Sequence, residues 1–255
     1  MTPSPDLTVP THLPTPPTDP PPVWFLTPEG FFALPLAGNP EERSARADAF
    51  VRDLYSRGDE SIWAPAAPYY TAIAELMENT GLSYAAIGLF STSEEERTPD
   101  GEVARHDLTD GAAQCAFTLA AVPTDQPDAD IAAQGILAVL SKDPFDEVQW
   151  LDLPCGPAVS CVTWREFKLN PEVTANGEPA DLVTAQIQVH VPFPTGPFTA
   201  VFTLFTASVD HWPQFIEMMG AILQTVSFAD PLEALSADES PAPGSSSRSS
   251  STSLS

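Results

Sequence analysis

The chain has 255 residues, of which 35 are Asp or Glu and 10 are Lys or Arg, so its formal net charge is −25. This balance argues against nucleic acid as a direct partner and against adsorption to an anionic membrane, because both need clusters of Lys and Arg. Hydrophobic residues make up 43% of the chain, which is enough to build a core.

Both ends of the chain have the composition of disordered tails. Residues 1–22 hold nine prolines and few apolar side chains, so ordering them would cost backbone entropy with little burial in return. The PxxP spacing at residues 14–17 is one that aromatic-lined peptide grooves recognise, and a plain flexible tail is the simpler alternative. Serine supplies ten of the last twenty residues, so we predict a second disordered tail over 229–255 and one folded domain over 23–228.

Turn residues and hydrophobic periodicity divide the folded part into elements. Asn39 can cap a first helix, Pro40 suits its first position, and Gly58 ends it. Residues 182–191 alternate apolar and polar side chains, which is typical of a strand with one buried face. The last helix has the clearest apolar stripe, and Asp210 is its predicted N-cap. We predict, in chain order, a hairpin over 23–34, helices over 39–58 and 68–80, strands over 83–91 and 112–122, a helix over 128–141, strands over 148–153, 159–169, 182–191 and 198–207, and a helix over about 210–226.

A short repeat supports a fold class. The tripeptide Phe-Thr-Leu at 117–119 recurs at 202–204, and each copy lies in a predicted strand that follows another strand and precedes a helix. The pattern predicts two strand–strand–helix units in one sheet; convergence of buried strands on the same residue types is the alternative. Either way, we predict an α+β fold in which helices cover a mostly antiparallel sheet of seven or eight strands.

The C-terminal part of the chain resembles a known group. A Phe-rich strand over 201–205, Trp212 at a helix start and a helix leading into Ser227-Phe228 are similar to the end of the PsbP-like α/β/α sandwich group. Gly-Pro-Ala at 156–158, before a strand, is also similar, and the resemblance covers residues 146–228. Members of that group mostly act as binding or assembly modules, so the resemblance implies adaptor-like work and no particular functional residue.

The sequence contains no recognised catalytic or metal-binding motif, so we predict no cofactor and no metal. It has no Gly-x-Ser-x-Gly elbow and no phosphate-binding loop. Cys155 lies in a predicted turn without a neighbouring positive charge, so we expect an ordinary thiol and not a nucleophile. The histidines are not at metal-ligand spacing; they are His12, His106, His190 and His211.

Carboxylates and tryptophans near the predicted strands allow further alternatives. A solvated sheet edge is the plain interpretation of four acids, with a paired-carboxylate site beside Arg165 as the alternative. These acids are Asp146, Glu147, Asp152 and Glu166. Trp150 and Trp164 flank a predicted turn, so they are expected to lie across from each other as core residues or as a stacking platform.

The segment from Thr92 to Gly111 is strongly acidic and is the candidate interaction surface. A basic protein partner would suit it, because opposite charges steer association. Weak Ca²⁺ binding and a plain solvated hairpin tip are the alternatives. The candidate residues are Glu94, Glu95, Glu96, Asp100 and Glu102.

The absence of targeting and catalytic motifs in the sequence gives expectations about compartment and function. No secretory signal or transmembrane run is visible and three cysteines give no disulfide framework, so a cytoplasmic location is expected. We predict a non-enzymatic binding or assembly protein with a protein partner and an oligomeric state that the sequence leaves open. The alternatives are an oligomeric structural subunit and a hydrolase whose site the sequence does not reveal.

Overall fold

The fold is described from a computed structural model. It covers residues 20–36, 39–56, 64–78, 80–91, 112–174 and 177–230. The two predicted tails lie outside this range except for residues 20–22 and 229–230, so their disorder stays a prediction.

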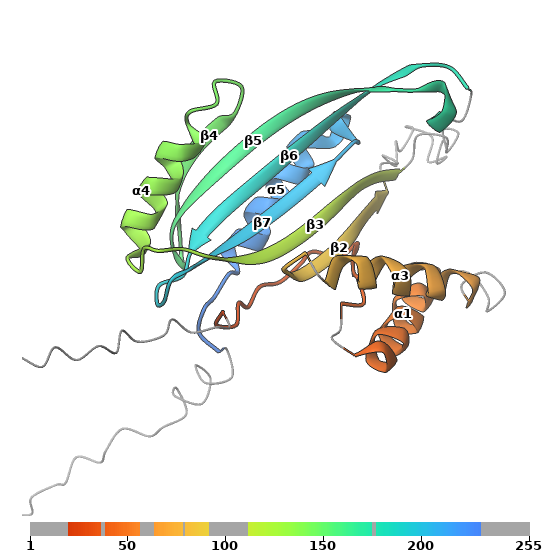
Figure 1. Ribbon diagram of the computed structural model, residues 1–255, viewed down its shortest axis with the longest axis horizontal. Coiled ribbons are helices and arrows are strands. Elements are labelled where there is room, and N and C mark those ends of the chain that lie inside the picture. Colours follow the sequence, from red (N-terminus) through yellow and green to blue (C-terminus); the bar gives the residue numbers. More distant parts are fainter. Residues whose placement is uncertain are drawn as a thin grey trace, which may run out of the picture.

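A seven-stranded sheet, in the order β1-β2-β3-β7-β6-β5-β4, forms the centre of the described residues (Figure 1). Every neighbouring pair is antiparallel, which confirms the predicted α+β class. The strands are β1 (Phe31–Ala33), β2 (Leu82–Ser91), β3 (Ala112–Pro123), β4 (Glu147–Leu153), β5 (Gly156–Leu169), β6 (Ala180–Pro192) and β7 (Phe198–Thr206).

Four α-helices of the described chain cover the sheet unevenly. Helix α5 lies behind the sheet in Figure 1, whereas α4 and the α1–α3 pair lie at two separate places in front of it. The helices are α1 (Pro40–Leu54), α3 (Ala67–Glu78), α4 (Ala129–Leu140) and α5 (Trp212–Gln224), with one-turn 3-10 helices η1 (Ala64–Ala66), η2 (Pro171–Val173) and η3 (Val209–His211). We call the α5 side the core face and the opposite side the open face.

The core face holds the main hydrophobic core. Alternate residues of each strand point to it, because successive side chains in a strand point to opposite sides. At its centre, the rings of Phe117 and Phe202 stack with centroids 6.3 Å apart. The fully buried side chains from β3, β6, β7 and α5 in this core include Phe117, Val189, Val191, Phe202, Leu204, Phe215, Met219 and Ile222.

Residues 20–30 form a strap over the core face, so the predicted hairpin over 23–34 is wrong in its first half. Only Trp24 forms a bridge, an isolated one to Ser227 beyond α5. Phe25 packs edge-on against the ring of Phe202, with centroids 5.7 Å apart. The apolar alternation that predicted a strand arises because Val23 and Phe25 point into the core while Trp24 is partly exposed.

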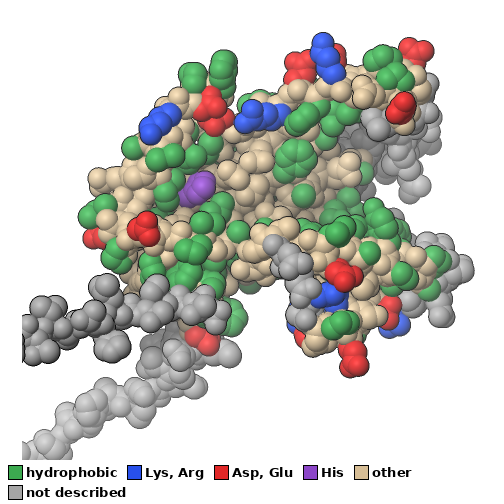
Figure 2. All heavy atoms as spheres, viewed as in Figure 1, with side chains coloured by type: hydrophobic (Ala, Val, Ile, Leu, Met, Phe, Trp, Pro, Cys, Tyr) green, Lys and Arg blue, Asp and Glu red, His purple; other side chains and the backbone are tan. Residues whose placement is uncertain are grey.

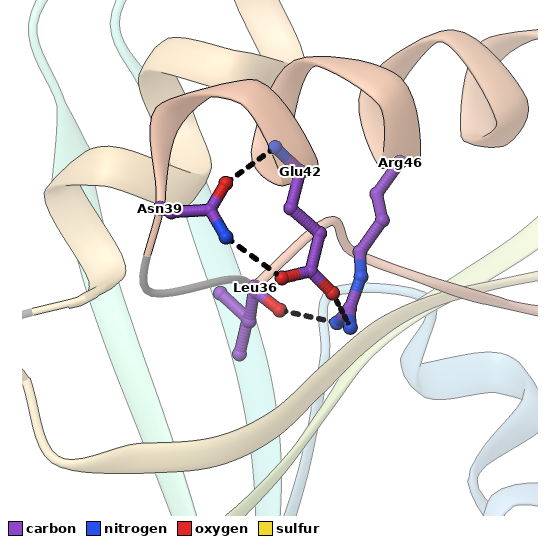
Figure 3. Close-up of polar contacts among 4 residues, drawn as sticks. All are labelled: Leu36, Asn39, Glu42 and Arg46. Carbon is purple, nitrogen blue, oxygen red and sulfur yellow. Dashed lines mark hydrogen bonds and ion pairs between the residues drawn. The ribbon is translucent and has the colours of Figure 1, made fainter.

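The predicted start of α1 is confirmed in detail. The Glu42 backbone N–H donates to Asn39 Oδ1 at 2.7 Å, which satisfies one of the unpaired N–H groups of the first turn (Figure 3). Arg46 forms an ion pair with Glu42 and donates to the Leu36 carbonyl oxygen at 2.7 Å. The cap therefore also fixes the helix to the segment that leaves β1.

The last helix begins differently from its prediction. Asp210 lies in η3, and α5 starts at Trp212 with His211 at its N-cap and no side-chain cap bond. Helix α4 does have a side-chain cap, because Asp128 Oδ1 accepts the Ile131 N–H at 3.0 Å. The apolar stripe thus located α5 correctly, whereas the choice of capping residue did not follow from residue type alone.

The predicted repeat holds for the strands and fails for the helices. Strands β3 and β7 are neighbours, and Thr118 lies directly opposite Thr203, so the two matching tripeptides face each other. A two-fold axis through that point, perpendicular to the sheet, would place both following helices on one face. Instead α4 and α5 lie on opposite faces (Figure 1).

Gly88 in β2 is fixed by close packing, so its replacement should destabilise the fold. A Cβ there would lie 2.5 Å from Cys115 Sγ and 2.7 Å from the Phe90 ring. We expect Gly88→Ala to lower the free energy of unfolding by about 1–3 kcal/mol, measured by urea denaturation. Gly220→Ala in α5 is the matched control, because a Cβ there meets nothing within 4 Å and should be neutral or stabilising. Equal losses in both variants would contradict this packing.

Candidate binding surface on the open face

The acidic residues proposed from the sequence lie outside the described part of the chain. These are Glu94, Glu95, Glu96, Asp100 and Glu102, which fall between the last residue of β2 and the first of β3. The ends of their segment, Ser91 and Ala112, are paired to each other in the sheet. The acidic surface therefore stays a prediction, and among the described residues the open face is the candidate binding surface.

The middle of the open face is a sheet surface without carboxylates. Across β3, β7 and β6 the strand register places on this face only uncharged side chains and His190. They include Gln114, Ala116, Thr118, Gln186, Gln188, Thr203 and Phe205. Figure 2 views this face, and its charged side chains lie mainly around the rim. The chain has a net charge of −25, and none of the carboxylates in the described ranges lies in this area.

Large apolar side chains are exposed on the same face. Leu89, Phe167 and Phe205, from β2, β5 and β7, are each more than one third exposed. Ala116 of β3 lies directly opposite Phe205 and is itself exposed, so it continues the apolar surface toward β2. Cross-strand and diagonal neighbours in a sheet are within reach of aromatic side chains. The open face thus combines apolar anchors with amide and hydroxyl groups.

The polar groups of the open face are partly bonded to one another. Gln188 Nε2 donates to Thr203 Oγ1 at 3.5 Å, a long hydrogen bond across the β6–β7 ladder. Thr163 Oγ1 donates to Asp146 Oδ1 at 2.8 Å at the edge next to α4. The long bond leaves Gln188 with unused hydrogen-bonding capacity, because an amide offers two donors and an acceptor.

Strands β5 and β6 extend beyond the rest of the sheet as a two-stranded arm. The ladder between β6 and β7 ends at Ala185, whereas β5 and β6 stay paired to Leu169 and Ala180. On the core face of the arm, the exposed Trp164 ring packs edge-on against Trp212, with centroids 5.4 Å apart. The arm therefore presents aromatic surface on both faces, since Phe167 is exposed on the open face.

The expected pairing of Trp150 with Trp164 is wrong. The turn between β4 and β5 lies between Leu153 and Gly156, earlier in the chain than the equal spacing of the two tryptophans required. Trp150 therefore lies opposite Val159, and Trp164 lies opposite Ala185. The two rings are consequently on opposite faces of the sheet. Trp150 Nε1 donates to Asp152 Oδ1 at 2.9 Å.

The four acids considered as a paired-carboxylate site do not share one face, because the strand register places Glu147 and Glu166 on the core face and Asp152 on the open face. No group of three His, Cys, Asp or Glu side chains within the described ranges is placed to hold a metal ion. Glu147 and Asp152 are exposed on the outermost strand, β4, and Asp146 is bonded to Thr163. The solvated-edge interpretation fits these positions.

A cavity of about 280 Å³ lies between the strap and the ends of β2 and β3. Its lining includes Pro20–Pro22, Tyr84 and Leu119, and Tyr84 is its one titratable group. Burial raises the pKa of that phenol above its ordinary value. The lining therefore offers no charged group for acid–base chemistry at neutral pH.

His190 is the titratable group on the uncharged part of the open face. It lies in β6 between Val159 and Val201 on the neighbouring strands, and its Nε2 is buried without a hydrogen-bond partner among the described residues. Burial lowers the pKa of its imidazole below the usual 6.5, because a charged ring is poorly solvated there.

The comparisons with known proteins give no relative for this chain. No protein-family model, curated protein or solved structure matches it. No helix in the described ranges is long and apolar enough to cross a bilayer.

His190 should make stability depend on pH. Its pKa is lowered in the folded state, so the unfolded chain binds more protons once the pH falls below about 6.5, and stability then decreases. We expect the His190→Gln variant to lose less stability than the parent protein between about pH 7.5 and 5.5, by urea denaturation at both values. Equal losses in the two proteins would show that burial of His190 does not matter.

The three thiols should react slowly. Burial raises the pKa of Cys115 to about 12 and also raises the pKa values of Cys155 and Cys161. Because the thiolate is the nucleophile, iodoacetamide at neutral pH should alkylate all three more slowly than glutathione. Mass spectrometry should detect Cys155 first, since it is only half-buried. Rapid alkylation of Cys155 would instead point to the nucleophile considered from the sequence.

Proposed function

We propose that this protein is a non-enzymatic binding or assembly protein that holds a partner protein on its open face. One observation carries the proposal: the uncharged middle of that face, with Phe205 exposed on it and Leu89 and Phe167 exposed on the same face beside it. The centres of protein interfaces are depleted in charged residues and enriched in aromatic ones. Exposed apolar patches on a soluble domain also mark interaction sites more often than accidents.

The distribution of charge on the open face also favours a docking role. A carboxylate buried at an interface without a partner costs several kcal/mol, so a docking surface on an acidic chain has to be kept free of Asp and Glu. The open face satisfies this condition over β3, β7 and β6, while acids are plentiful elsewhere in the sequence. The amides of Gln186 and Gln188 supply hydrogen-bonding groups that need no counter-charge.

The partner is expected to be basic outside its contact surface. The chain has a net charge of −25, and opposite net charges accelerate association without adding charge to the contact itself. The acidic residues proposed from the sequence, Glu94–Glu96 among them, would act in this steering role. The resemblance of residues 146–228 to PsbP-like binding modules supports a binding role.

The hydrolase alternative would need converging titratable groups in a cleft. The cavity beside the strap has Tyr84 as its titratable group, and its other lining residues are uncharged. It therefore lacks such converging groups. An oligomeric role would use a different surface, the outer side of α4.

Photo-crosslinking from the open face tests the proposed function. A benzophenone amino acid placed at Phe205, in the protein expressed in its native cells, should capture a specific partner identified by mass spectrometry. The matched control is the same amino acid at Trp24, because Phe205 and Trp24 are 40% and 39% exposed on opposite faces of the sheet. Capture of the same proteins at both positions, or of none at Phe205, would contradict the proposal.

Affinity for the captured partner gives a second, quantitative test. Phe205→Asp should weaken binding of the purified partner at least about tenfold, because it places a charge in the centre of the contact. Trp24→Asp should leave the affinity unchanged, and thermal unfolding of both variants would report any loss of folding. Raising the salt concentration should slow association if the partner is basic.

A further inference from the structure

Helix α4 is apolar on both sides, although only one side packs on the sheet. Ala132 and Ala133 are buried against the open face near β4, β5 and β6, and their small size lets the helix lie close to the strands. On the opposite side, Ile131 is 53% exposed and Val139 is 60% exposed. A helix that is hydrophobic all round is normally buried all round. The outer side of α4 is therefore a surface that needs a cover.

Small and apolar residues line the outer side of α4 at helical spacing, and we call this surface the outer stripe. Ile131, Gly135, Ala138 and Val139 form it, at the spacing that places residues on one side of a helix, and the exposed Gln134 flanks it. A Cβ on Gly135 would meet nothing within 4 Å, so the middle of the stripe is open. Small residues at the middle with larger ones at the ends allow two helices to approach closely.

Apolar surface continues past the end of the helix. Phe145 lies in the turn from α4 to β4 and is 88% exposed. The turn itself is ordered, because Asp143 Oδ1 accepts the Phe145 N–H at 3.0 Å. An aromatic ring held in solvent by a structured turn extends the stripe toward the outermost strand.

The charges at the two ends of α4 differ in sign. Asp128 caps the N-terminus and Asp130 follows it, whereas Lys142, one of two lysines in the chain, directly follows the C-terminus. Between Asp130 and Lys142 the helix has no charged residue. Three acids follow Lys142 closely: Asp143 accepts the Phe145 N–H, Asp146 accepts the Thr163 hydroxyl, and Glu147 is the first residue of β4.

We propose that the outer stripe is the contact of a homodimer in which α4 pairs antiparallel with α4 of a second copy. A two-fold axis near Gly135 and Ala138 places Ile131 of each copy on Val139 of the other. The same axis places Asp130 of one copy beside Lys142 of the other, twice. The pairing is isologous, as in most dimers, and it places the positive end of each helix dipole beside the negative end of the other.

A second copy fits this surface better than other occupants do. Two chains of net charge −25 repel each other, so self-association costs least at a contact that buries no carboxylate, and the outer stripe is such a contact. Its charge pattern is complementary to itself only in the antiparallel arrangement. A 12-residue helix is about 18 Å long, less than a standard interface requires, so even with Phe145 we expect a micromolar dissociation constant.

Sedimentation equilibrium of the full chain over about 1 to 300 μM tests the dimer. The parent protein should pass from monomer to dimer in this range, and Ile131→Asp should weaken dimerisation at least about thirtyfold by placing two carboxylates at the contact. Leu76→Asp is the matched control, because Leu76 is an apolar residue on a different helix, α3, and at 77% exposure it is more exposed than Ile131. A monomer at every concentration, or a dimer that Ile131→Asp leaves intact, would overturn the proposal.

A charge exchange separates the pairing from a general effect of folding. Asp130→Lys and Lys142→Glu should each weaken the dimer about three- to tenfold, and the double variant should recover most of the loss. Failure of the double variant to recover would rule out the antiparallel arrangement. The open-face variant Phe205→Asp should dimerise normally, so this proposal and the proposed function can fail independently.

Discussion

The ladder between β3 and β7 holds the two halves of the sheet together. In the strand order it is the one described pairing between β1–β2–β3 and β7–β6–β5–β4. The Phe117–Phe202 stack lies on this ladder, and the strap places Phe25 against both rings. A substitution that loosens this contact would separate two groups of hairpins that are each marginal alone, since small sheets need a shared hydrophobic face.

The same arrangement explains why one face stays open. Helix α5 and the strap together cover the core face, whereas α4 covers mainly β4–β6 and the α1–α3 pair lies near β1 and β2 (Figure 1). The middle strands are left between them on the other side. Those strands carry threonine, glutamine and phenylalanine where a purely solvent-facing surface of such an acidic chain would carry carboxylates. The proposed docking role depends on this contrast.

Local chemistry in the sequence was sufficient to predict most elements. Asn39 and Asp128 are caps because their side chains reach N–H groups three residues away, and the alternation in β6 needs only its own residues. Sequence reasoning failed where distant segments decide. The strap has the alternation of a strand because Phe25 fits between rings from β2, β3 and β7, and nothing near Phe25 indicates this. The open face could have been suspected from the absence of acids in the predicted strands, but strand order, which places those residues together, is not a local property.

The strap also brings the two ends of the folded body to one place. Trp24 and Ser227 exchange backbone hydrogen bonds of 2.9 Å in both directions, so the first and last described segments close the chain into a ring. Leu26 adds a bond from its N–H to Thr225 Oγ1 at 2.9 Å. A mechanical force applied to the two termini would therefore act on these few hydrogen bonds before any strand of the sheet. They would break while the β-sheet behind them remained intact.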